Sequence, residues 1–175
     1  MLDSLSRRQF SARLTSLLGV GLLDGDMITQ ITASRDDVTK TSEAIHQEVT
    51  FAASARRIYQ ALTDAAEFTK VTAFSSVKNA PPAHIEALAG GTFSLFGGHI
   101  VGRQVELVPA QRLVQAWRVV DWTPGIFSIA KFSLVDHGGK STLVFDHTGF
   151  PNGLGDHLAR GWRTNYWEPL AKYLG

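Results

Sequence analysis

The chain has 175 residues, of which 44% are hydrophobic and 19% are charged, and these values are typical of one globular domain rather than of a disordered or fibrous chain. Its 17 lysines and arginines against 16 acidic residues give a net charge of +1, with no basic run longer than a pair, which argues against nucleic-acid binding. Because the chain has no cysteine, disulfides, thiolate nucleophiles, iron–sulfur clusters and cysteine-ligated zinc are excluded.

An arginine pair precedes a short apolar stretch near the N-terminus. Arg7 and Arg8 are followed by Phe10, and the run "LTSLLGVGLL" at 14–23 is too short for a transmembrane helix. The segment resembles a twin-arginine export signal, although the cleavage site at 31–33 is poor. It also fits an amphipathic helix that docks its apolar side chains. The chain is therefore expected either in the cytoplasm or, after twin-arginine export, in the periplasm.

A composition change separates this segment from the rest of the chain. Residues 24–44 are rich in Asp, Thr and Ser and show no sustained period, which is typical of a linker. We therefore divide the chain into a signal-like segment with its linker, residues 1–44, and one folded domain, residues 45–175.

The folded domain begins with a strand and two short helices. "IHQEVTF" at 45–51 alternates apolar and polar residues, which predicts a half-buried strand. The next segment, 54–68, changes to helical spacing, with Ser54 placed as an N-cap and a second short helix beginning near Asp64.

Strands fill the middle of the domain and a helix ends it. Between 91 and 148, β segments are separated by short Gly- and Pro-containing links, which predicts an antiparallel meander of five or six strands. From 153 to 174, apolar residues recur every four positions, which predicts a long helix that kinks or restarts at Pro169. The fold class is therefore α+β, with the C-terminal helix covering one face of a twisted sheet.

Glycines surround the strand "TFSLF" at 92–96. Gly90-Gly91 and Gly97-Gly98 lie at its two ends, where the chain must turn sharply. Gly102 interrupts the following strand, as expected where a curved sheet bends around a helix.

The glycine-rich hairpin at 90–102, Trp117-Arg118 and the segment from His147 to Pro151 carry a family resemblance. Together with the order of elements, they resemble the bacterial relatives of the activator of the heat-shock-protein-90 ATPase. These belong to the START-like (SRPBCC), helix-grip superfamily, which includes polyketide cyclases, lipid-transfer domains and pollen allergens. The resemblance covers about residues 45 to 175 and implies a curved antiparallel sheet wrapped around the C-terminal helix. Because this fold hosts carriers, enzymes and co-chaperones, it does not fix the function.

The resemblance also implies a cavity between the sheet and the C-terminal helix. Alternation along the last strand places Leu143, Phe145 and His147 on the more apolar face, which we expect to point inward. The apolar residues of the neighbouring strands and the aromatic stripe of the helix complete the predicted ligand-binding set: Phe93, Leu95, Trp117, Phe132, Phe145, His147, Trp162 and Tyr166.

The polar candidates are open to more than one interpretation. An inward His147 is either a proton donor or acceptor for a ligand, or a core histidine whose ring nitrogens are satisfied by its neighbours. Arg103 and Arg118 are either carboxylate anchors or solvated strand residues. His99 is expected at the cavity rim. The histidines have no metal-ligand spacing and no cofactor motif is present, so neither a metal nor a cofactor is expected.

Three functions remain as hypotheses. The first is binding of a small hydrophobic or aromatic molecule in the cavity, by a monomer or a homodimer. The second is a cyclase- or lyase-type enzyme that uses His147 as general acid or base, although no catalytic motif is recognised. The third is a co-chaperone-like stimulator of a heat-shock ATPase, which the family resemblance suggests.

Overall fold

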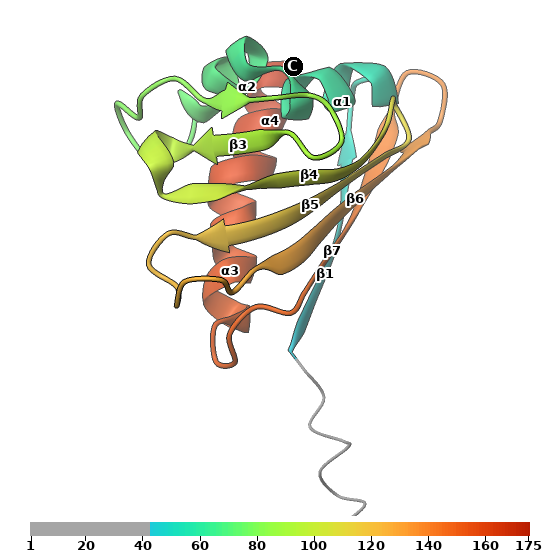
Figure 1. Cartoon of the computed structure of the whole chain (residues 1–175). Coiled ribbons are helices and arrows are strands. Elements are labelled where there is room, and N and C mark those ends of the chain that lie inside the picture. Colours follow the sequence, from blue (N-terminus) through green and yellow to red (C-terminus); the bar gives the residue numbers. More distant parts are fainter. Residues whose placement is uncertain (1–42) are drawn as a thin grey trace, which may run out of the picture. The chain divides into compact units, whose positions relative to one another are not determined.

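A computed structural model describes residues 43–175, and the twin-arginine-like segment and nearly all of the predicted linker lie outside these residues. The described part contains β strands and helices in the order expected for an α+β domain (Figure 1). The strands are β1 (Ala44–Phe51), β2 (His84–Ile85), β3 (Thr92–Leu95), β4 (Ile100–Val108), β5 (Arg112–Val119), β6 (Ser128–Asp136) and β7 (Ser141–Thr148). The helices are α1 (Ala55–Thr63), α2 (Ala65–Thr72), the 3-10 turn η2 (Phe96–Gly98), α3 (Gly155–Trp162), the π-helix η3 (Arg163–Trp167) and α4 (Glu168–Leu174).

Within residues 43–175 the strands form a seven-stranded sheet in the order β1-β7-β6-β5-β4-β3-β2, with every neighbouring pair antiparallel. The sheet curves around the C-terminal helical segment, and α1 and α2 lie at one end of it (Figure 1). This confirms the predicted α+β helix-grip fold, including the two short helices after the first strand. The two-residue strand β2 carries too short a pattern to be recognised from sequence.

Side-chain caps explain where the two short helices begin. Ser54 Oγ accepts a hydrogen bond from the backbone N–H of Arg57 at 3.3 Å, as its N-cap position predicts. Asp64 Oδ1 accepts from the N–H of Glu67 at 2.9 Å and begins α2. Both caps satisfy N–H groups that a helix cannot bond internally.

The bend of the sheet depends on Gly102 in β4. A Cβ atom at this position would lie 2.1 Å from the carbonyl oxygen of Ala116 and 2.3 Å from Cζ of Phe93. Glycine is therefore required here by close approach, and the buried Phe93 ring occupies the space that a side chain would need. A bulge between Gln104 and Glu106 adds a further bend to the same strand.

The C-terminal helical segment changes its winding in the middle. In η3 the N–H of Glu168 bonds to the carbonyl of Arg163, five residues back, in place of the usual four. Pro169 stands in the first turn of α4, where its missing N–H causes no loss. The helix does not restart at Pro169, because the backbone stays helical from Gly155 to Leu174; the irregularity expected near this residue takes the form of a π turn before the proline.

None of the helices in residues 43–175 has the length and apolar character that a membrane crossing requires.

The close contact at Gly102 predicts a large loss of stability for Gly102→Ala. The added methyl group would overlap Ala116 and Phe93, so the free energy of unfolding should fall by about 2 to 3 kcal/mol. Urea denaturation measures this change. Gly161→Ala in α3 is the matched control: a Cβ there meets no heavy atom within 4 Å, so this variant should be slightly more stable than the wild type. Equal stabilities for Gly102→Ala and the wild type would contradict this account of the bend.

Candidate functional site

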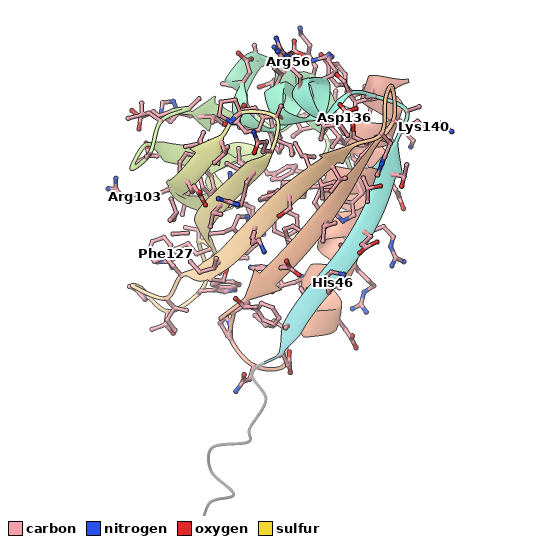
Figure 2. All side chains as sticks on the ribbon, turned by 90° about the vertical axis from the view of Figure 1, so that its right-hand side faces the viewer. His46, Arg56, Arg103, Phe127, Asp136 and Lys140 are labelled. Atoms are coloured by element: carbon pink, nitrogen blue, oxygen red, sulfur yellow. The ribbon has the colours of Figure 1, made fainter. Side chains whose placement is uncertain are left out.

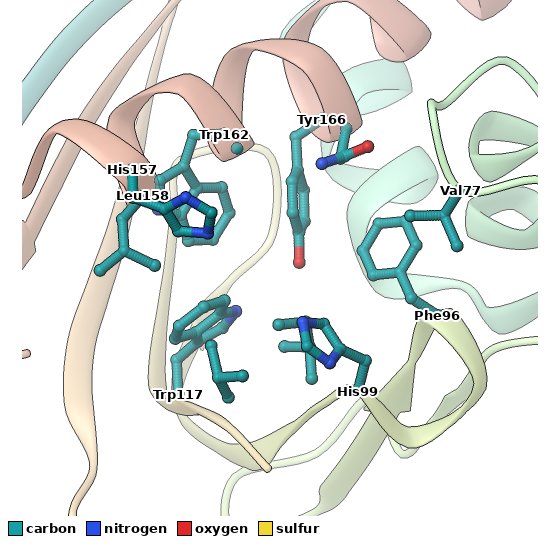
Figure 3. A pocket seen from close by; sticks show the side chains of 12 residues that line it. Val77, Phe96, His99, Trp117, His157, Leu158, Trp162 and Tyr166 are labelled. Atoms are coloured by element: carbon teal, nitrogen blue, oxygen red, sulfur yellow. The ribbon is translucent and has the colours of Figure 1, made fainter. Parts of the chain in front are cut away.

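A small pocket lies between one end of the sheet and the C-terminal helical segment (Figure 3). Its volume is about 100 Å³. The sheet side is formed by η2, the start of β4 and the end of β5, and the helical side by α3 and η3. The lining residues are Val77, Phe96, His99, Ile100, Trp117, Val119, His157, Leu158, Gly161, Trp162, Asn165 and Tyr166.

The pocket has a buried aromatic floor and an exposed rim. Trp117 and Trp162, whose ring centroids are 5.4 Å apart, are buried in the floor. At the rim, Val77, His99 and His157 are exposed to solvent. A molecule entering between the rim residues would therefore meet mainly apolar surface.

The π turn η3 and its neighbours hold the helical wall in place. Tyr166 stacks against Trp162 with ring centroids 4.2 Å apart and points its hydroxyl into the pocket (Figure 3). Asn165, in the same turn, accepts a hydrogen bond from the hydroxyl of Ser76 at 2.6 Å through Oδ1. This bond connects the loop that carries the rim residue Val77 to η3, which forms the helical side of the pocket.

Two buried polar atoms of the pocket wall have no hydrogen-bond partner within residues 43–175. They are the indole Nε1 of Trp117 and the hydroxyl of Tyr166. Trp117 is 3% exposed and Tyr166 is 6% exposed, so solvent does not readily replace the missing partners. Burial raises the pKa of Tyr166. The indole N–H of Trp117, which lies close to the hydroxyl without meeting the geometry of a hydrogen bond, lowers it in part. The hydroxyl is therefore a neutral hydrogen-bonding group at physiological pH.

His147 lies in the core, where both ring nitrogens have partners. The indole N–H of Trp162 can only donate, and it donates to Nδ1 of His147 at 3.0 Å. The ring therefore carries its proton on Nε2, which donates to Ser128 Oγ at 2.7 Å. The Ser128 hydroxyl in turn donates to the carbonyl of Trp117 at 2.8 Å. This chain of hydrogen bonds, the His147 chain, connects the helix to β7, β6 and β5.

The His147 chain leaves no place for a second proton on the imidazole. Burial lowers the pKa of His147 from 6.5 to about 4, so the ring is neutral near pH 7. Of the two interpretations of this residue, the core histidine with satisfied nitrogens is the one that the geometry supports. His147 is also not a lining residue of the pocket.

The eight predicted ligand-binding residues are divided between the pocket and the solid core. Trp117, Trp162 and Tyr166 line the pocket. The remaining five are buried elsewhere in the core: Phe93, Leu95, Phe132, Phe145 and His147. The ring of Phe145 packs against Trp162 with centroids 4.3 Å apart and against Phe132 at 5.0 Å, so this part of the interior is filled by protein. Ligand contact by these eight residues stays a prediction.

The two arginines considered as carboxylate anchors do not line the pocket. Arg103 extends from the domain surface (Figure 2) and donates to the carbonyl of Gly90 at 3.0 Å. Arg118 donates to the carbonyl of Val120 at 3.0 Å, and its guanidinium lies 5.6 Å from the ring centre of Phe127. Both side chains therefore bond to loops that connect strands of the sheet.

Apart from His99, the other lining residues were not predicted from the sequence. Phe96 is buried beside Leu95 because the strand ends there and η2 begins with a positive φ of 51° at Phe96, which breaks the alternation. Leu158 belongs to the predicted apolar stripe of the helix, and that stripe was the available signal. His99 lies at the rim as expected. Asn165 and Val77 carried no signal in the sequence.

No cluster of three or more His, Cys, Asp or Glu side chains able to hold a metal ion occurs in the part of the chain that the structure describes.

The curved antiparallel sheet with the C-terminal helix across it defines an α+β domain of the helix-grip fold. The family model "Activator of Hsp90 ATPase homolog 1-like protein" matches residues 52–175. The chain belongs to this family.

A curated protein with a similar sequence carries the name of the same family. The human activator of 90 kDa heat shock protein ATPase homolog 1 is 30% identical over 94 residues, which are 54% of this chain and 28% of the human protein. The chain therefore spans well under half of that relative.

Two solved structures share the fold. The crystal structure of an HSP90 activator from Plasmodium falciparum has a TM-score of 0.68 at 23% identity and covers 75% of this chain and 96% of that one. The solution structure of the Aha1 dimer from Colwellia psychrerythraea has a TM-score of 0.60 at 20% identity, with the same coverage of both chains.

The His147 chain predicts a specific dependence of stability on pH. Because the folded-state pKa is depressed, the unfolded chain takes up the proton first as the pH falls. The contribution of His147 is therefore complete above about pH 6.5 and is lost progressively towards about pH 4. Between about pH 7.5 and pH 5, the stability advantage of the wild type over His147→Gln should shrink by about 2 kcal/mol. Urea denaturation of both proteins at the two pH values measures it.

His46 provides the control for this pH dependence. A hydrogen bond to Asp146 raises the pKa of His46, so its contribution to stability is present at low pH and lost as the pH rises. The advantage of the wild type over His46→Gln should therefore change with pH in the opposite direction. An advantage over His147→Gln that is constant with pH would show that the imidazole is not held neutral.

Proposed function

We propose that this domain binds a small apolar molecule in the pocket between β5, η2 and the C-terminal helical segment. The observation that carries the proposal is the aromatic lining of Trp117, Trp162 and Tyr166 beneath a rim that opens to solvent. Concave, mostly apolar sites with few polar groups are the usual form of small-molecule sites.

The volume of the pocket supports a small occupant. Typical drug-sized ligands occupy about 300 to 1,000 Å³, whereas an apolar cavity of about 150 Å³ takes up benzene. At about 100 Å³ the pocket matches one ring more closely than a lipid chain or a polycyclic molecule. Larger ligands would require the loop at 75–78 or η2 to move.

The cyclase- or lyase-type alternative is not proposed. It depended on an inward His147 acting as general acid or base. Nδ1 of this ring accepts from Trp162 and Nε2 contacts Ser128, so neither nitrogen is free to exchange a proton with a bound molecule. No other histidine lies in the floor of the pocket, because His99 and His157 are at its exposed rim.

Filling the pocket should abolish ligand binding without unfolding the domain. Gly161 lines the pocket from α3, and a Cβ at this position meets no heavy atom within 4 Å, so Gly161→Leu places a side chain into the free space. With the wild type, toluene at ten times its dissociation constant should add about 1.4 kcal/mol to the stability. With Gly161→Leu it should add nothing. Thermal unfolding with and without toluene measures both.

Arg160→Leu is the matched control, because Arg160 is the exposed neighbour of Gly161 on the same helix and does not line the pocket. This variant should respond to toluene as the wild type does. If small aromatic molecules stabilise Gly161→Leu and the wild type equally, the pocket is not their binding site and the proposal fails.

Stimulation of a heat-shock ATPase is the second candidate function, favoured by the similarity to activators of the 90 kDa heat shock protein ATPase. The domain should then bind that chaperone in a pull-down and raise its rate of ATP hydrolysis. Gly161→Leu separates the two candidates, because it changes the pocket and leaves the outer surface unaltered. Stimulation retained by this variant would assign the chaperone activity to another surface, and no stimulation by either protein would exclude it.

The localisation and the oligomeric state of the chain also help to decide between small-molecule binding and stimulation of a chaperone. Export through the arginine-pair segment would keep the chain from a cytosolic chaperone, and a mass spectrum of the protein from its native host reports whether the segment is removed. Of the two states expected, monomer and homodimer, the homodimer has support from the structurally similar Aha1 dimer of Colwellia psychrerythraea. Light scattering of the purified chain measures that state directly.

A further inference from the structure

We propose that the ligand of this pocket is a neutral, single-ring molecule that carries an oxygen atom in hydrogen-bond contact with the indole N–H of Trp117 and the hydroxyl of Tyr166. This inference rests on the proposed function and names the chemical class of the ligand. Phenols and small aromatic aldehydes or ketones belong to this class.

The position of the oxygen follows from the two unpartnered polar atoms. Four buried side-chain nitrogen or oxygen atoms lack a hydrogen-bond partner in residues 43–175, and two of them, Trp117 Nε1 and Tyr166 Oη, belong to pocket-lining residues. The other two belong to Gln104 and Ser141, which do not line the pocket. A buried donor without a partner costs about 1 to 3 kcal/mol. A ligand oxygen that accepts from both groups would remove that cost, so the site favours molecules that supply one.

The two groups have fixed and complementary roles. The indole N–H of Trp117 can only donate, whereas the Tyr166 hydroxyl can donate or accept. The position of Trp117 is fixed by its backbone carbonyl, which accepts a hydrogen bond from the Ser128 hydroxyl of the His147 chain. The Tyr166 ring is fixed by Trp162 at 4.2 Å and by Phe96 at 5.5 Å between centroids. Figure 3 shows the Tyr166 hydroxyl directed towards the side of the pocket formed by Trp117 and His99.

The charge of the lining selects a neutral ligand. None of the 12 lining residues, all of which lie in the described part of the chain, is lysine, arginine, aspartate or glutamate, and the two histidines among them, His99 and His157, are at the exposed rim. An ionised carboxylate or ammonium in the floor would therefore be buried without a counter-charge, which is strongly unfavourable. Two neutral donors satisfy a carbonyl or hydroxyl oxygen but do not compensate a full negative charge.

The experiment compares three probes of similar size with the full chain: phenol, toluene and benzoate. Phenol should bind about tenfold more tightly than toluene, since a factor of ten corresponds to 1.4 kcal/mol, the scale of one buried hydrogen bond. Benzoate should bind more weakly than toluene. Titrations followed by two-dimensional NMR of the backbone and indole N–H groups give the three dissociation constants.

Tyr166→Phe tests the assigned contact, because it removes the hydroxyl and keeps the ring. The preference for phenol over toluene should fall from about tenfold to about threefold or less. Toluene affinity should stay unchanged. Tyr173→Phe is the matched control: its hydroxyl bonds to Glu67 and Arg57 away from the pocket, so the preference for phenol should persist.

Stability without any ligand provides a second readout. Removing an unpartnered buried hydroxyl should raise the melting temperature of Tyr166→Phe by about 3 °C, whereas Tyr173→Phe should lower it, because it breaks two hydrogen bonds. A lower melting temperature for Tyr166→Phe would show that the hydroxyl is engaged within the protein and would overturn the assignment.

The binding results separate failure of the oxygen assignment from failure of the proposed function. If phenol and toluene bind the wild type equally and Tyr166→Phe changes neither, the pocket binds apolar rings, the proposed function stands and the assignment of the oxygen is overturned. If benzoate binds most tightly, the neutral class is wrong. If none of the three probes binds, both the assignment and the proposed function fail.

Discussion

The hydrogen-bond chain from Trp162 through His147 and Ser128 to the carbonyl of Trp117 is the constraint on which the rest of the domain depends. It joins the C-terminal helix to three strands by directional bonds inside an otherwise apolar core. Because an indole N–H only donates, the direction of every bond in the chain is fixed, and so is the imidazole tautomer. Fully satisfied buried networks of this kind favour one arrangement of the elements over others.

The C-terminal helical segment is bonded to the sheet on the side that faces β1 and borders the pocket on the side that faces β4 and β5. Near β1, Gln47 accepts from the indole of Trp167 at 2.6 Å and donates to the carbonyl of Ala159 at 3.0 Å, so helix and sheet are closely joined there. Towards β4 and β5, the indole N–H of Trp117 and the hydroxyl of Tyr166 both lack a hydrogen-bond partner within residues 43–175, and both residues line the pocket. The interior beside Phe145 is filled by side chains, whereas, in the described part of the chain, the indole N–H of Trp117 and the hydroxyl of Tyr166 remain unpartnered in residues that line the pocket.

The hydrophobic periodicity and the helix-capping residues predicted the architecture well, because both depend only on residues that are close together in the sequence. Alternation placed His147 inward and Ser54 began its helix as expected. The site could be predicted only in part, since lining a pocket depends on which inward side chains are covered by others. Phe145 and Trp162 have the same apolar character in the sequence, yet only Trp162 lines the pocket, because Phe145 lies beneath it. The π turn and the positive φ at Phe96 likewise depend on contacts between distant segments.

The four tryptophan indoles offer the most direct test of the central claim that the His147 chain leaves Trp117 free to meet a ligand. In a proton–nitrogen NMR spectrum titrated with phenol, the indole signal of Trp117 should shift strongly. The indole signals of Trp162 and Trp167, which already donate to His147 and Gln47, should move little. An unmoved Trp117 signal, or a Trp162 signal that shifts as much, would contradict the account.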